Sequence, residues 1–224
     1  IFGDMPIFVS HDSADVWAGR DAFLLDESGQ PEVVAGVPPD YFSATGQRWG
    51  NPHYNWPQME KSGFAWWKDR LRFQLALFDL VRIDHFRGFQ ACWEIPADEE
   101  TAINGRWVEV PGHALFQSLY REFNPLPIVA EDLGIITPEV EALRDEFALP
   151  GMKILQFAFS EGAGNFYLPH HHIPNCVVYT GTHDNDTTLG WLAGIDEQTR
   201  RYLYNYADLE REGMPWALIR LALG

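Results

Sequence analysis

The sequence predicts an α/β fold of the TIM (β/α)8 barrel type, and three observations support this prediction. Short apolar runs without polar alternation recur along the chain, as expected of strands buried on both faces in a parallel sheet covered by helices. Helical patterns separate these runs. Acidic residues directly follow three of the runs, and TIM barrels carry their chemistry at the carboxyl ends of the strands.

A doubly wound open sheet is the alternative fold. No glycine-rich phosphate-binding loop follows the first strand, which argues against it. About five strands can be recognised, so we expect an incomplete piece of the barrel, with long inserted loops at residues 10–56 and a hairpin insertion at residues 92–112. We treat residues 1–224 as one partial catalytic domain.

Composition restricts the function classes. A formal net charge of −16 disfavours nucleic acid, whose phosphates would be repelled. No segment approaches the roughly 18 uninterrupted apolar residues of a membrane span. Aromatic residues make up 14% of the chain, with 9 tryptophans, which suits flat neutral ligands such as sugars, although most aromatic side chains belong to the core.

The N-terminal quarter predicts a strand, a long loop region and a helix. Residues 1–9 are expected to form a strand that ends near a functional edge. Residues 10–56 are rich in glycine, proline, aspartate and aromatics, and a long loop of this kind is usually functional. The alternative is a loop that packs its own aromatics as a satellite core. Residues 57–78 show helical periodicity.

In the stretch 81–89, an apolar strand ends in charged residues. At a period of two, Arg82 and Asp84 share one face of this strand. A guanidinium beside a carboxylate lowers the pKa of the acid and keeps it ionised. A structural ion pair at a strand end is the alternative interpretation.

Further elements follow in order. Asn104-Gly105 between strand-like runs indicates a hairpin. The pattern then predicts alternating helices and strands, and Thr137 is the expected N-cap of the helix that begins at residue 138. These elements cover the helix 113–123, the strand 127–130, the helix from 138, the strands 152–159 and 176–180, and the helices 197–207 and 215–223.

Three strand ends carry the acids Asp84, Glu131 and Asp184, which would converge on one cleft of a barrel. Retaining cleavage of a glycosidic bond needs an ionised carboxylate and a protonated carboxylic acid about 5 to 5.5 Å apart. Asp84 beside Arg82 suits the ionised role. Glu131 suits the acid, because it follows an apolar run and negative neighbours would raise its pKa. Asp184, beside His183, could stabilise the positive charge that develops.

A metal site is the competing interpretation. His85, His183, Asp184 and Asp186 could bind a divalent ion, and residues 170–172 are three adjacent histidines. No established metal-ligand spacing accompanies them, so no metal is expected. Cys92 and Cys176 have no such spacing either, and we expect reduced thiols in a cytoplasmic protein.

Several segments together resemble the 4-α-glucanotransferases, the amylomaltases or disproportionating enzymes of glycoside hydrolase family 77 in the α-amylase superfamily. Three match the family's signature segments: Arg82-Ile83-Asp84-His85-Phe86, Ala130-Glu131-Asp132-Leu133-Gly134 and Thr182-His183-Asp184-Asn185. Residues 4–9 resemble its third barrel strand. Residues 36–42 and 46–52 resemble its active-site loop. The resemblance extends over essentially the whole chain.

The resemblance implies retaining double displacement on α-1,4-glucans and maltooligosaccharides, without a cofactor. Asp84 would be the nucleophile, Glu131 the acid/base and Asp184 the transition-state stabiliser. The other residues that the resemblance assigns would contact the sugars: Arg82, His183, Asp40, Tyr41, Phe42, Gln47, Trp49 and Asn51. An aromatic loop that holds an acceptor sugar and excludes water would favour transfer over hydrolysis.

Against the implied fold, the chain matches about strands 3 to 7 of the barrel. Both ends look cut, so open strand edges lead us to expect that these residues alone are inactive or poorly folded. Two alternative functions remain: an α-amylase-type retaining hydrolase with the same acids, and a non-catalytic glucan-binding protein.

Overall fold

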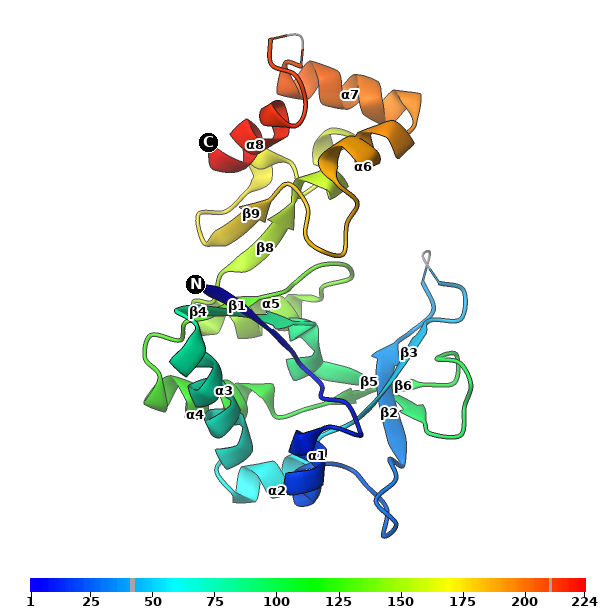
Figure 1. The fold of residues 1–224 in the computed structure, drawn as a ribbon, viewed down its shortest axis with the longest axis vertical. Coiled ribbons are helices and arrows are strands. Elements are labelled where there is room, and N and C mark those ends of the chain that lie inside the picture. The colour runs from blue at the N-terminus through cyan, green and yellow to red at the C-terminus, as the bar shows by residue number, and fades with distance from the viewer. Residues whose placement is uncertain (41–42, 210) are drawn as a thin grey trace. The chain divides into compact units, whose positions relative to one another are not determined.

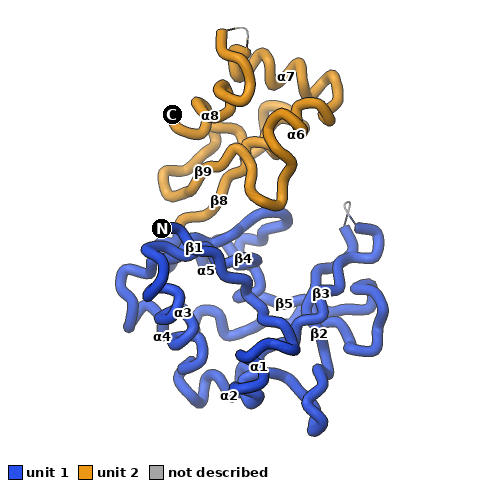
Figure 2. Tube along the Cα trace, in the orientation of Figure 1, with its two compact units in different colours: residues 1–149 blue, residues 150–224 orange. Residues whose placement is uncertain are grey.

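The structure, a computed structural model, describes residues 1–40, 43–209 and 211–224. The chain divides into two compact units, residues 1–149 and residues 150–224 (Figure 2). In the described residues, no helix combines the length and the apolar character needed to cross a membrane.

A parallel three-stranded sheet forms the centre of the first unit. Its strands lie in the order β1 (Phe2–Pro6), β4 (Leu80–Asp84) and β7 (Ile128–Ala130) (Figure 1). The middle and last strands are almost wholly buried, because their apolar side chains enter the main core. The predicted parallel sheet is therefore confirmed for this unit, and burial on both faces is confirmed for β4 and β7, whereas β1 alternates between exposed and buried residues.

The prediction of one helix over residues 57–78 is wrong. Two helices occupy this region, α2 (Trp56–Lys61) and α3 (Ala65–Leu77). Gly63 and Phe64 separate them with φ values of 65° and 59°. This left-handed backbone interrupts the run of right-handed helix, and glycine adopts it without strain. Periodicity continued across the break because Phe64 is itself buried.

The loop region 10–56 is more ordered than the sequence predicted. It contains α1 (Ala14–Ala18), a short 3-10 helix (Arg20–Ala22), and the strands β2 (Val33–Val37) and β3 (Gln47–Pro52). The two strands are antiparallel neighbours, with a register shift between Val34 and Gly36. A Cβ at Gly36 would lie 2.1 Å from the backbone oxygen of Gln47, so this close approach requires glycine.

The predicted hairpin is confirmed, with a longer connection than Asn-Gly alone. Strands β5 (Ala91–Pro96) and β6 (Arg106–Glu109) are antiparallel, and the loop between them spans residues 97–105. Strand β5 also pairs with β2, which produces a second sheet in the order β3-β2-β5-β6 (Figure 1). The two predicted insertions are thus joined in one antiparallel sheet.

Helices complete the first unit close to their predicted positions. They are α4 (Gly112–Glu122) and α5 (Pro138–Glu146). Thr137 occupies the N-cap position of α5, but its side chain makes no capping hydrogen bond. Helix α4 buries Leu115, Phe116 and Leu119, so its inner face belongs to the same core as the parallel sheet.

The second unit contains a parallel pair of strands and three α-helices within the described residues 150–209 and 211–224. Strands β8 (Gly151–Ile154) and β9 (Cys176–Tyr179) lie side by side. The strand predicted over residues 152–159 is too long, because a 3-10 helix begins at Leu155. The helices are α6 (Thr188–Gly194), which the sequence patterns did not predict, α7 (Glu197–Ala207) and α8 (Trp216–Leu223).

Candidate active site

A buried arginine holds two acids at the end of the central sheet. The register of β1 and β4 places Asp4 beside Arg82 on the same face. Nη1 of Arg82 donates to both carboxylate oxygens of Asp4, at 2.8 and 2.9 Å, and Nη2 donates to Oδ1 of Asp84 at 2.5 Å. The Arg82 side chain is 9% exposed, whereas those of Asp4 and Asp84 are 47% and 45% exposed. The cation therefore lies beneath two carboxylates that reach solvent.

The contact between Arg82 and Asp84 was predicted from their spacing, whereas the part of Asp4 was not. Asp4 is the charged residue of an otherwise apolar strand, which is the signal that could have drawn attention to it. Its partner lies 78 positions away in the chain. Only the pairing of β1 with β4 shows that the two side chains meet.

Glu131 lies next to Asp84 because the strands are in register. Ile83 pairs with Ala130, and the backbone N–H of Glu131 donates to the oxygen of Ile83 at 3.0 Å. The carboxylate accepts two backbone hydrogen bonds, Oε2 from His85 N–H at 2.7 Å and Oε1 from Leu133 N–H at 3.1 Å. Its position is thus fixed through the backbone on both sides.

The environment of Glu131 favours its protonated form. Burial, and then the negative charge of Asp84, raise the pKa of Glu131 to about 7. The hydrogen bond from His85 N–H and the charge of Arg82 act in the opposite direction without cancelling this rise. These are the two causes that the sequence indicated. A carboxyl group with this pKa can give up or accept a proton near neutral pH.

His85 connects the acids to the antiparallel sheet. Its φ of 55° turns the chain after β4, so that its N–H points at Glu131. Its ring packs edge to face on Trp49 of β3, with centroids 4.9 Å apart. Burial, with a smaller effect of Arg87, lowers the pKa of His85 to about 4, so the ring is neutral near pH 7.

Two of the predicted sugar-contacting residues, Trp49 and Gln47, are held near the acids by the contact between Trp49 and His85. Trp49 lies against His85 and donates its indole N–H to Oε1 of Gln47 at 3.0 Å. The Trp49 ring keeps an exposed face. The fold therefore brings an aromatic surface and an amide close to the strand ends that carry Asp84 and Glu131.

The other predicted loop residues have structural contacts of their own. The amide of Asn51 donates to the backbone oxygen of Val9 at 3.0 Å, which holds β3 to the chain that follows β1. Oδ1 of Asp40 accepts from Ser43 N–H at 2.8 Å. Tyr41 and Phe42, which are predicted to contact the acceptor sugar, lie outside the described residues.

Asp184 and His183 lie in the second unit, in the loop after β9. Oδ1 of Asn185 accepts from the N–H and the hydroxyl of Thr182, at 2.8 and 3.1 Å, and so closes the loop. Nε2 of His183 lies 3.5 Å from Oδ1 of Asp184, and both side chains are exposed. The two neighbouring side chains therefore lie within the range of an electrostatic contact. The convergence of Asp184 with Asp84 and Glu131 stays a prediction.

A buried ion pair beside Glu131 was missed by the sequence patterns. Oδ2 of Asp132 accepts from Nη1 of Arg144 at 2.5 Å, and both side chains are more than nine-tenths buried. The pair joins the residue after Glu131 to helix α5. Its signal in the sequence is an arginine on the helix that follows an acidic strand end, which shows the charges but not that they meet.

No cluster of three or more histidine, cysteine or acidic side chains in the described part of the chain is arranged to hold a metal. The three adjacent histidines contact protein atoms instead. Nδ1 of His170 lies 2.9 Å from the hydroxyl of Tyr206, and Nε2 of His171 and of His172 lie 3.0 and 2.8 Å from backbone oxygens. These rings secure the loop between β8 and β9.

The family model described as 4-alpha-glucanotransferase, glycoside hydrolase 77, matches residues 1–224. The chain is 58% identical to the 4-alpha-glucanotransferase of Thermus thermophilus, over 100% of this chain and 46% of that protein. It is 57% identical to that of Synechocystis sp., over 99% of this chain and 45% of that protein. The chain thus spans about half the length of the curated relatives it matches.

A solved structure shows the same fold. The amylomaltase from Streptococcus agalactiae in complex with acarbose matches with a TM-score of 0.95 and 41% identity, over 99% of this chain and 45% of that chain. The amylomaltase from Corynebacterium glutamicum matches with a TM-score of 0.76 at 21% identity, a likeness of fold alone. The fold is therefore α/β, of the TIM-barrel type.

Proposed function

Because the chain belongs to the glycoside hydrolase 77 family of 4-alpha-glucanotransferases, we propose that the protein moves segments of α-1,4-glucan from a donor to an acceptor sugar. The observation that carries this proposal is the pair of acids at adjoining strand ends. Asp84 accepts a hydrogen bond from a buried arginine, and the pKa of Glu131 is raised to about 7. Retaining transfer needs one carboxylate and one carboxylic acid placed together in this way.

The proposed reaction has two steps. Glu131 donates its proton to the glycosidic oxygen while Asp84 attacks the anomeric carbon, so that the glycosidic bond breaks and a covalent glucosyl-enzyme forms. Asp184, with His183 beside it, stabilises the positive charge that develops on the sugar. A hydroxyl group of the acceptor sugar then attacks the same carbon, Glu131 takes its proton, and Asp84 is released.

Transfer rather than hydrolysis requires that a sugar hydroxyl reaches the intermediate before water does. Trp49 and Gln47, next to His85, support this because they offer a stacking surface and a hydrogen-bonding amide near the acids. We propose the same role for Asp40, Tyr41, Phe42 and Asn51, and donor-site contacts for Arg82 and His183. Maltooligosaccharides and starch- or glycogen-type glucans are the proposed substrates.

We also propose how the chain relates to the full fold. Strands β1, β4, β7, β8 and β9 are about the third to seventh strands of an eight-stranded barrel, and the sheet β3-β2-β5-β6 is inserted between them. The share of the relatives that the chain covers, 45% to 46%, supports this assignment. Residues 1–224 made alone should then be inactive. The two free cysteines support a cytoplasmic location.

Incubation of the full gene product with maltotriose tests the function. A ladder of longer maltooligosaccharides together with free glucose supports transfer. Glucose and maltose without any lengthening would favour an α-amylase-type hydrolase instead. Asp84→Asn should abolish turnover and leave maltooligosaccharide binding intact, and a protein that binds glucan but turns over none would be a non-catalytic binding protein.

A further inference from the structure

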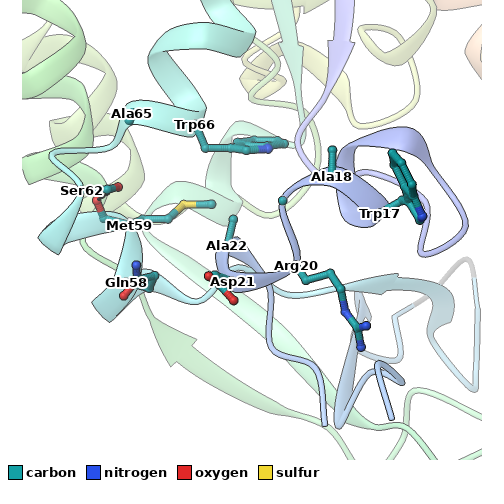
Figure 3. Close-up of a pocket in the computed structure, with 11 residues that line it drawn as sticks. Trp17, Ala18, Arg20, Asp21, Ala22, Gln58, Met59, Ser62, Ala65 and Trp66 are labelled. Atoms are coloured by element: carbon teal, nitrogen blue, oxygen red, sulfur yellow. Dashed lines mark hydrogen bonds between the residues drawn. The ribbon is translucent and has the colours of Figure 1, made fainter. Parts of the chain in front are cut away.

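A surface groove surrounds α1 (Ala14–Ala18) in the first unit. Its lining residues include neither Asp84 nor Glu131. Its largest hollow has a volume of about 420 Å³ and lies between α1, the following 3-10 helix and helices α2 and α3 (Figure 3). Hollows of about 310 and 260 Å³ adjoin it, since one shares Trp66 and the other shares Trp17 and Arg20. We call these three hollows the α1 groove. The volume of the largest hollow by itself already lies within the range of ~300–1,000 Å³ typical of ligand sites.

Two tryptophans give the groove its flat apolar surfaces. Trp66 is held in place, because Trp67, Tyr54 and Phe23 pack against it with ring centroids 5.2 to 5.6 Å apart. Trp17 is 83% exposed, more than any other tryptophan of the chain. A fixed aromatic platform binds a flat ligand with little loss of conformational freedom. The solvent-exposed indole of Trp17 offers a second surface on which a ligand ring can stack.

Polar side chains beside the tryptophans are available for a ligand. Arg20, Asp21 and Gln58 line the largest hollow, and Figure 3 shows Asp21 across the hollow from Trp66. Among the described residues, the side chains of these three make no ion pair with one another. Together they offer donors, acceptors and an amide that is both, which is what the hydroxyl groups of a sugar require.

The charge of the groove favours a neutral occupant. Asp12, Asp15 and Asp21 line the groove against Arg20, and the chain as a whole carries a net charge of −16, so an anion is repelled and a neutral ligand is preferred to it. Flat apolar walls with mixed donors and acceptors suit a saccharide, whose rings have apolar faces and polar edges. Three adjoining hollows suit a chain of sugar units better than a single sugar.

We propose that the α1 groove is a second α-glucan-binding site, which holds part of a long substrate chain away from the acids. Trp17 and Trp66 stack on successive sugar rings, and Arg20, Asp21 and Gln58 bind their hydroxyl groups. Anchoring of a long glucan raises its effective concentration at the acids. A short oligosaccharide that occupies only one site gains nothing from the groove. The choice of α-glucan among neutral saccharides rests on the proposed function.

The test compares long and short substrates in the full gene product. Trp17→Ala should weaken the retardation of the protein in gels that contain amylose, with an increase in Kd of about tenfold for the loss of one stacking surface. The KM for amylose should rise by a similar factor, while kcat and KM for maltotriose stay unchanged. Gln58→Ala, a second exposed position of the groove, should give a smaller change in the same direction.

Trp216→Ala is the matched control, because Trp216 is also an exposed tryptophan but lies on α8, outside the groove. Wild-type retardation of Trp17→Ala, or an equal loss in Trp216→Ala, would overturn the proposal. The two proposals fail separately. Maltotriose turnover with no effect of Trp17→Ala overturns the second site alone, whereas loss of amylose retention in Trp17→Ala supports the site even if the protein transfers nothing.

Discussion

The pKa of Glu131 gives a prediction about stability that does not depend on any substrate. In the folded protein this pKa is about 7, against an ordinary value of 4.5. A raised pKa means that the folded state holds the proton more tightly than the unfolded state. Its stabilising contribution is therefore complete below pH 4.5 and is lost as the pH rises through 7. The difference corresponds to about 3 kcal/mol between pH 4 and pH 8.

Glu131→Gln removes this titration and keeps the shape of the side chain. Glutamine has one acceptor oxygen, so one of the two hydrogen bonds from His85 N–H and Leu133 N–H is lost, at about 1 kcal/mol. That loss does not depend on pH. Relative to the wild type, the variant should be less stable by about 1 kcal/mol at pH 4 and more stable by about 2 kcal/mol at pH 8.

Urea unfolding followed by circular dichroism at pH values from 4 to 8 measures this difference. Glu139→Gln serves as the control, since Glu139 is exposed on α5 and the nearby Thr137 hydroxyl lowers its pKa, which reverses the sign of the pH trend. The reasoning is refuted if Glu131→Gln has the same effect on the free energy of unfolding at pH 4 and pH 8.

Three further predictions concern the surroundings of the acids. Arg82→Met should raise the pKa of Glu131 above 7, because the charge of Arg82 lowers this pKa in the wild type. The alkaline limb of the pH profile of the residual kcat/KM should therefore move to higher pH. A limb at the wild-type pH would contradict this. Asp132→Ala should destabilise the protein by about 3 kcal/mol in urea unfolding, since it removes the buried partner of Arg144 and leaves only the exposed Asp145 to pair with it. The double variant Asp132→Leu/Arg144→Met should recover part of that loss, because no charge is then left buried. A loss below about 1 kcal/mol in Asp132→Ala would argue against a stabilising ion pair. Trp49→Ala should lower kcat/KM for maltotriose by about tenfold through loss of a stacking surface, and initial rates equal to the wild type would exclude Trp49 from the sugar site.

Much of the fold could be predicted where the signal is local. The strand Ile128–Ala130 and the helix Glu197–Ala207 were predicted within one residue, because an apolar run and a helical period are properties of neighbouring positions. The strand Gln47–Pro52 was missed, since it is mostly exposed and polar. Its order comes from pairing with Val33–Val37, which no local pattern reveals.

The sequence by itself determined that Arg82 and Asp84 meet, because two residues apart on a strand means the same face. It also determined that an acid after the apolar run Ile128–Ala130 has a raised pKa. Only the tertiary structure decided that Asp4 shares Arg82 and that Glu131 lies beside Asp84. Those contacts depend on the register between strands far apart in the chain, and that register is set by how the whole sheet packs.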